Sequence, residues 1–116
     1  MTRTLVFDGP RAAKRFELLW LSLLNGGDGK GDRSPVTIRK EARLQTLLDT
    51  ISESVEGPGD PPLRKLAGEA ATIAVPQEDF DLLVTYAEKT GWTPRVAREV
   101  VDLWDWLSAA PRKDTP

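Results

Sequence analysis

Residues 71–110 read ATIAVPQEDFDLLVTYAEKTGWTPRVAREVVDLWDWLSAA, and their pattern predicts a compact unit of one strand and two helices. Its first five residues are rich in β-branched side chains, which predicts a short strand over residues 71–75. Pro76 suits the first turn of a helix, where its missing N–H is not needed, and Gly91 ends that helix. The stretch therefore predicts a strand that leads directly into a helix over residues 76–89.

A second helix is predicted over residues 94–109, because Thr93 can cap it and Pro94 suits its first turn. Its apolar residues recur at helical spacing, as on the buried face of an amphipathic helix. Trp104 lies in the middle of this stripe, so we expect its side chain to be buried. The stripe consists of Val96, Ala97, Val100, Val101, Trp104 and Leu107.

The N-terminal half is divided by proline and glycine in the same way. Residues 4–7 predict a strand, and amphipathic helices are predicted over residues 10–24 and 35–55. A weaker strand over residues 63–66 could pair with the strand over residues 71–75. The connecting loops are predicted at residues 25–34 and 56–62.

Length and composition set the size of the fold. The chain has 116 residues, of which 40% are hydrophobic and 29% charged, which suits one small domain over residues 1–116. We predict a mainly α (α+β) fold with about four helices and a small sheet of two or three strands.

Residues 72–110 resemble C-terminal segments of small proteins of unknown function from tailed-phage and prophage genomes. The likeness rests on the short strand, the acidic start of the first helix, Trp92 in the turn between the helices and the final amphipathic helix. This resemblance implies a phage context, and it assigns no activity and no site residues.

The chain contains neither histidine nor cysteine. Ser–His and Cys–His nucleophile pairs, thiolate metal sites, disulfides and redox motifs are therefore excluded. Chemistry would depend on carboxylates, lysines, arginines, one tyrosine and hydroxyl groups. We expect a protein that is not an enzyme and that holds no cofactor and no metal.

The most motif-like segment is GGDGKGD, residues 26–32. A phosphate-binding loop needs Ser or Thr after Gly-Lys, but Gly31 follows Lys30 here, and a helix rather than a strand precedes the segment. A calcium loop that begins at Asp28 would need Glu at its twelfth position, which Arg39 occupies. We therefore interpret the segment as a tether between two helices.

Acidic residues gather at the start of the helix over residues 76–89. Glu78, Asp79 and Asp81 would need further ligands from elsewhere to form a metal or acid–base site, and an acidic first turn already complements the helix dipole. Asp102 and Asp105 are expected on a solvent-exposed face of the last helix.

Charge differs between the two halves of the chain. Residues 1–43 carry nine Lys and Arg against five Asp and Glu, whereas residues 44–116 carry seven against thirteen. An ordinary solvated surface explains this asymmetry best, and a nucleic-acid partner for the basic half is the alternative. The asymmetry would also suit head-to-tail packing of identical subunits. The nucleic-acid candidates are Arg11, Lys14, Arg15, Arg39, Lys40 and Arg43.

Apolar residues exceed what one buried face requires. Leu18 and Leu21 lie away from the main stripe of their helix, and Trp106 lies at the edge of its stripe. Two readings stay open. Either the first helix is buried on two sides, under the small sheet, or these three residues form a protein interface.

These observations favour a protein–protein interaction or assembly module that acts with a protein partner or by self-association, for example a phage structural, morphogenesis or regulatory protein. The alternative is a nucleic-acid-associated protein that uses the basic half. A carboxylate-based metal enzyme is a third, weaker reading. No segment approaches the roughly 18 apolar residues of a membrane span, so we expect no membrane partner and a cytoplasmic protein, or one carried in a virion.

Overall fold

We describe a computed structural model that covers residues 1–26, 34–57 and 63–113. In these residues it has four α-helices, one 3₁₀ turn and five strands, which confirms the predicted mainly α fold. None of the described helices is long and apolar enough to cross a membrane. The elements are β1 (Thr2–Phe7), α1 (Ala12–Asn25), α2 (Pro35–Asp49), β2 (Ser52–Ser54), β3 (Arg64–Leu66), β4 (Ala71–Pro76), α3 (Gln77–Lys89), the 3₁₀ turn (Pro94–Val96), α4 (Ala97–Ser108) and β5 (Arg112–Lys113).

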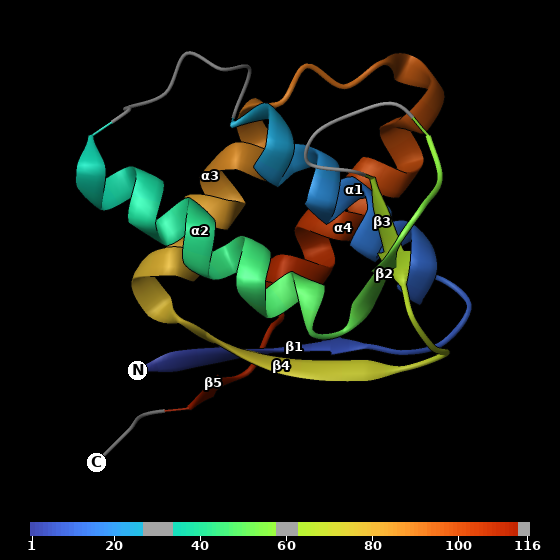
Figure 1. Cartoon of the computed structure of the whole chain (residues 1–116). Coiled ribbons are helices and arrows are strands. Elements are labelled where there is room, and N and C mark those ends of the chain that lie inside the picture. The colour runs from blue at the N-terminus through green and yellow to red at the C-terminus, as the bar shows by residue number, and fades with distance from the viewer. Residues whose placement is uncertain (27–33, 58–62, 114–116) are drawn as a thin grey trace.

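One antiparallel sheet has the strand order β4-β1-β5, and the helices cover one of its faces (Figure 1). Side chains alternate between the two faces of a strand, so Leu5 of β1 and its partner Ile73 of β4 point into the core together. Thr72 and Ala74 of β4 point the other way and are exposed. The predicted strands over residues 4–7 and 71–75 are therefore confirmed, and they pair with each other.

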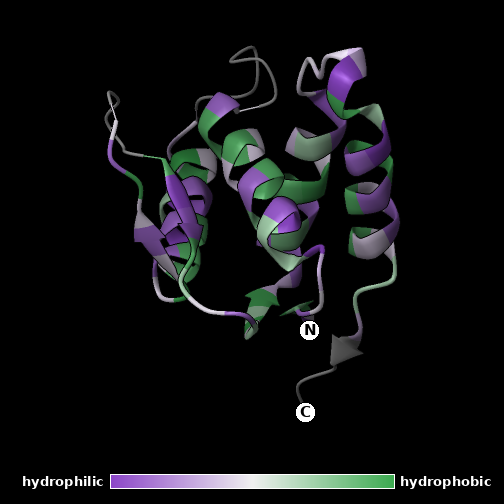
Figure 2. Cartoon of the chain, turned by 90° about the vertical axis from the view of Figure 1, so that its right-hand side faces the viewer, coloured by the Kyte–Doolittle hydropathy of each residue, from purple (hydrophilic) through white to green (hydrophobic). Residues whose placement is uncertain are grey.

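Helix α1 occupies the middle of the molecule, where it contacts α3 and α4 and also β3. More than one face of α1 is covered, so Leu18 is only 2% exposed and belongs to the core. This corrects the expectation that Leu18 could lie on a surface patch. Along every helix hydrophobic and hydrophilic residues alternate, as Figure 2 shows. Besides Leu18, the buried residues of α1 include Phe16, Leu19, Trp20 and Leu23.

Helix α2 ends at Asp49, six residues before the predicted end at Val55. The Thr50 and Ser52 hydroxyls donate to the carbonyls of Leu47 and Leu48, at 2.6 and 2.7 Å, and so satisfy the open end of the helix. The chain then enters β2, which forms a second, two-stranded antiparallel sheet with β3.

The strand predicted over residues 63–66 exists as β3, but its expected pairing with residues 71–75 is wrong. It pairs with β2, and ion pairs support this arrangement. Lys65 lies 3.3 Å from Glu53, and Arg64 lies 3.0 Å from Asp49 at the end of α2.

Helix α4 corrects the expectation for Trp104. Val100, Leu103 and Leu107 form the buried stripe, whereas the Trp104 residue is 38% exposed. Because neighbouring helical residues are about 100° apart, turning Leu103 inward places Trp104 at the edge of the stripe. The Trp104 indole donates to the Ala87 carbonyl at 3.0 Å, near the end of α3.

Candidate functional site

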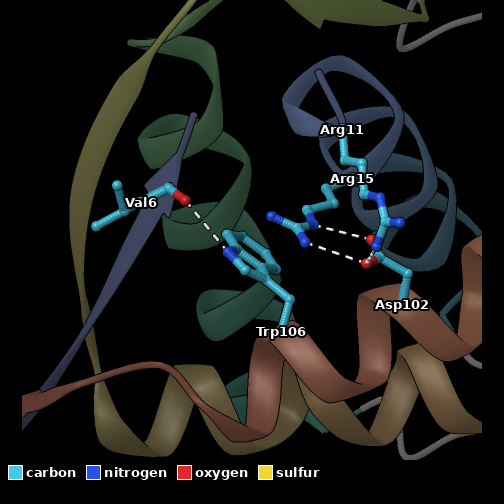
Figure 3. A network of polar contacts seen from close by, with 5 residues as sticks. All are labelled: Val6, Arg11, Arg15, Asp102 and Trp106. Atoms are coloured by element: carbon cyan, nitrogen blue, oxygen red, sulfur yellow. Dashed lines mark hydrogen bonds and ion pairs between the residues drawn. The ribbon is translucent and has the colours of Figure 1, made fainter. Parts of the chain in front are cut away.

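Of the three residues proposed for an interface, Leu18 and Trp106 pack against other residues of the same chain. Leu18 is buried in the core, while Leu21 is half-buried on the same helix. The Trp106 ring packs against Phe7 at 4.9 Å between ring centroids, and its Nε1 donates to the Val6 carbonyl at 3.2 Å (Figure 3). The three side chains therefore do not form one exposed apolar patch.

Arg11, which directly precedes α1, and Arg15 of α1 converge on Asp102 of α4 (Figure 3). Arg15 donates to the Asp102 carboxylate from Nε at 2.9 Å and from Nη2 at 3.1 Å, and Arg11 donates from Nη1 at 2.6 Å. The hydrogen bonds from Arg15, with that from Arg11, lower the pKa of Asp102 below its usual value despite partial burial. Asp102 thus ties α1 to α4 and is not the freely solvated residue that we expected.

Arg43 of α2 and Asp79 of α3 form a second ion pair between helices. Asp79 is fully buried and accepts two hydrogen bonds from Arg43, at 3.0 and 2.7 Å, while Glu78 lies 3.5 Å from the same guanidinium. The hydrogen bond and charge of Asp79 raise the pKa of Arg43. Beside this pair, the Tyr86 hydroxyl donates to the buried Glu41 at 2.9 Å.

The acidic start of α3 is divided among separate partners. Asp79 binds Arg43, whereas Asp81 accepts a 2.7 Å hydrogen bond from the Gln77 amide. Within the described ranges, no group of three or more carboxylates is placed to hold a metal ion.

Most of the cations proposed to contact nucleic acid are already neutralised. Arg11 and Arg15 bind Asp102, Arg43 binds Asp79, and Lys14 lies 3.4 Å from Glu17. Only Arg39 and Lys40 lack an acidic partner in the part of the chain that the structure covers. The six residues lie in two parts of the chain, at the start of α1 and along α2.

The glycine-rich segment interpreted as a tether lies outside the described residues apart from Gly26. Gly26 ends α1 in a left-handed conformation, with φ of 55°, and its N–H bonds the Ser22 carbonyl at 3.1 Å.

The most unusual surface is the outer edge of β4, which lies at the end of the strand order. The Thr4 N–H donates to the Pro111 carbonyl at 2.9 Å, and this bond lies on the side of β1 away from β4. The neighbours Arg3 and Leu5 therefore pair with β4. Backbone N–H and C=O groups alternate in the same way along β4, so those of Thr72 and Ala74 point away from β1. No described residue forms a hydrogen bond with these outward-pointing backbone groups.

A groove of about 500 Å³ runs beside this edge, between β4 and α2. Its walls are mainly apolar, with the Arg43–Asp79 pair at one end. The remaining lining residues are Ala42, Thr46, Leu47, Ala74 and Pro76.

The open face of the β1–β4 pair carries no charge. It consists of Thr2, Thr4, Val6, Thr72, Ala74 and Pro76, as the strand register and the alternation of burial require. The sequence pattern predicted both strands, but not the order that leaves β4 at the edge of the sheet. The alternation of small and apolar residues along residues 71–76 was the signal that could have located this surface.

The chain matches no known protein family, no curated protein and no solved structure in the comparisons made.

Proposed function

We propose that the protein is a non-enzymatic assembly module that associates with a second copy of itself along β4. The observation that carries the proposal is the outer edge of β4, where the backbone groups of Thr72 and Ala74 have no partner among the described residues. An exposed strand edge is a template for pairing with another chain.

The edge suits pairing with its own copy. A two-fold axis through Ile73 places Thr72 of one copy opposite Ala74 of the other, and the reverse. Both residues carry an N–H and a C=O that point outward, so this register forms four backbone hydrogen bonds. Pro76 has no N–H and ends the ladder at that side.

The absence of charge at the edge favours the same arrangement. A two-fold axis brings every residue near its centre close to its own copy, so a charged residue there would meet a like charge. Thr72, Ile73 and Ala74 are all uncharged. Proteins commonly protect exposed edges with lysine or other charged residues, and this edge has no such residue.

The resemblance of residues 72–110 to small phage proteins of unknown function extends this proposal to a phage context, and it assigns no activity. The paired cations of the N-terminal half give less support to the nucleic-acid alternative, since four of the six already bind carboxylates.

The proposed register is tested by disulfide cross-linking, because the natural chain contains no cysteine. Thr72→Cys and Ala74→Cys proteins are mixed under mild oxidation, and each is also oxidised alone. The proposed pairing places the two thiols opposite each other only in the mixed dimer, so we expect the mixture to cross-link faster than either variant alone. Equal rates in all three samples would exclude this register.

Sedimentation equilibrium tests the association itself. Ala74→Pro removes an outward N–H without affecting the bonds between β1 and β4, and it should give a monomer with an unchanged circular dichroism spectrum. Ala74→Ser keeps the N–H and serves as the matched control, which should remain dimeric. A natural chain that stays monomeric at the highest concentration reached would contradict the proposal.

A further inference from the structure

A second surface feature lies away from the β4 edge and is independent of it. A cleft of about 340 Å³ opens between β1, α3 and α4. Arg3 of β1 and Phe80 of α3 lie in its wall, together with Trp104 of α4. Polar and apolar groups share the lining, as in small-molecule sites.

Arg3 is a buried cation that has no carboxylate partner among the described residues. The residue is only 6% exposed, and its guanidinium lies 4.4 Å from the centre of the Phe80 ring. Its only hydrogen-bond acceptors among the described residues are the carbonyls of Leu107 and Ser108, at 3.4 and 3.5 Å from Nη2. These contacts are long, so the buried charge is poorly compensated.

Two polar atoms in the cleft lining are left without partners. Arg3 Nε is a buried donor with no acceptor, and Gln77 Oε1 is a buried acceptor with no donor. The other end of the Gln77 amide is fixed, since its Nε2 donates to Asp81 at 2.7 Å. Buried polar atoms are nearly always satisfied by protein, water or a ligand. Both atoms are shielded from solvent, so they mark unused hydrogen-bonding capacity in the wall of the cleft rather than positions already open to a ligand.

The rest of the lining restricts the charge of a ligand. Asp81 and Glu88 add two exposed carboxylates to the cleft, on the helix opposite Arg3. A dianion such as phosphate would be repelled by these carboxylates, whereas a simple cation would leave the Arg3 charge uncompensated. A ligand that carries both a negative and a positive charge would complement Arg3 on one side of the cleft and the two carboxylates on the other.

We propose that this cleft binds a free amino acid with an apolar side chain. The carboxylate of the ligand accepts hydrogen bonds from Arg3, through Nη1 and, after a rotation of the side chain, through the enclosed Nε. The ammonium group is attracted by the exposed carboxylates of Asp81 and Glu88. The apolar side chain lies against Phe80 and Trp104.

Isothermal titration of the natural chain with L-leucine tests the proposal, with L-leucinamide and N-acetyl-L-leucine as matched probes. The amide lacks the carboxylate and the acetyl derivative lacks the ammonium group. Each should bind at least about tenfold more weakly than leucine, because each loses charge-assisted hydrogen bonds. Inorganic phosphate should not bind. Absence of leucine binding, or equal binding of leucine and leucinamide, would overturn the proposal.

Variants assign the binding to this cleft. Arg3→Met and Glu88→Gln should both weaken leucine binding, the first more strongly, whereas Arg98→Met removes an exposed arginine outside the cleft and should bind as the natural chain does. In addition, the NMR signal of the Arg3 Nε–H should shift when leucine is added. A shift that is absent at saturation, or a loss of binding in Arg98→Met equal to that in Arg3→Met, would show that leucine binds elsewhere.

Discussion

We expect the charge of Arg3 to contribute little to stability, because its guanidinium is buried and no described carboxylate pairs with it. Replacing a poorly compensated buried charge by an apolar side chain of similar length is often neutral or stabilising. We expect Arg3→Met to leave the free energy of unfolding unchanged or to raise it by about 1 kcal/mol, measured by urea denaturation without ligand. Arg3→Ala is the control, and it should lower the same quantity by about 2 kcal/mol because it also removes packing against Phe80. A large loss in Arg3→Met would show that the charge itself stabilises the fold.

Asp102 makes stability depend on pH in the acid range. Its two arginine partners lower its pKa in the folded state, so the ion-paired form contributes stability above the unfolded-state pKa. This contribution is lost as the pH falls through the lower, folded-state pKa. Asp102→Asn should reduce the free energy of unfolding by about 1–2 kcal/mol near pH 7, and the difference should shrink as the pH falls below about 4. A difference that is independent of pH would contradict this account. Asp105→Asn, on the exposed side of α4, is the control.

At the scale of single elements, the ends and faces of the helices depend on contacts that periodicity alone does not contain. The pattern predicted α4 but placed Trp104 in the buried stripe, whereas its neighbour Leu103 is the residue that faces inward. In α2 the stripe continued to Val55, but the hydroxyls of Thr50 and Ser52 bond the last carbonyls and end the helix early. Such competition between side chain and backbone is visible only once the neighbouring strand is placed.

The corrected stripe of α4 predicts unequal effects for two neighbouring residues. Leu103→Ala should lower the free energy of unfolding by about 2–5 kcal/mol, because Leu103 is fully buried. Trp104→Ala should cost only about 1–2 kcal/mol, since the exposed ring loses partial burial and one hydrogen bond to Ala87. Thermal or urea unfolding of both variants checks the order. A larger loss in Trp104→Ala than in Leu103→Ala would show that Trp104 faces the core, as the sequence pattern had predicted.

At the scale of the whole molecule, both proposed surfaces depend on the pairing of β1 with β4. This pairing places Arg3 opposite Val75, two residues before Gln77, so residues far apart in the sequence line one cleft. It also leaves β4 at the edge of the sheet. The sequence predicted the two strands and their neighbouring helices, but strand order and cleft depend on long-range pairing. No local pattern around Arg3 distinguished it from the other arginines of the basic half.

Self-association along β4 makes the stability of the whole molecule depend on its concentration. A second copy that binds only the folded chain shifts the equilibrium away from the unfolded state by mass action. For the natural chain and for Ala74→Ser, each tenfold increase in protein concentration should therefore raise Tm by a few degrees. In Ala74→Pro the outward ladder cannot close, so its Tm should be independent of concentration. Calorimetry over a hundredfold concentration range measures this difference. If the Tm of Ala74→Pro rises with concentration as that of the natural chain does, the contact between copies lies on another surface. The uncharged face of the β1–β4 pair would then be the next to mutate.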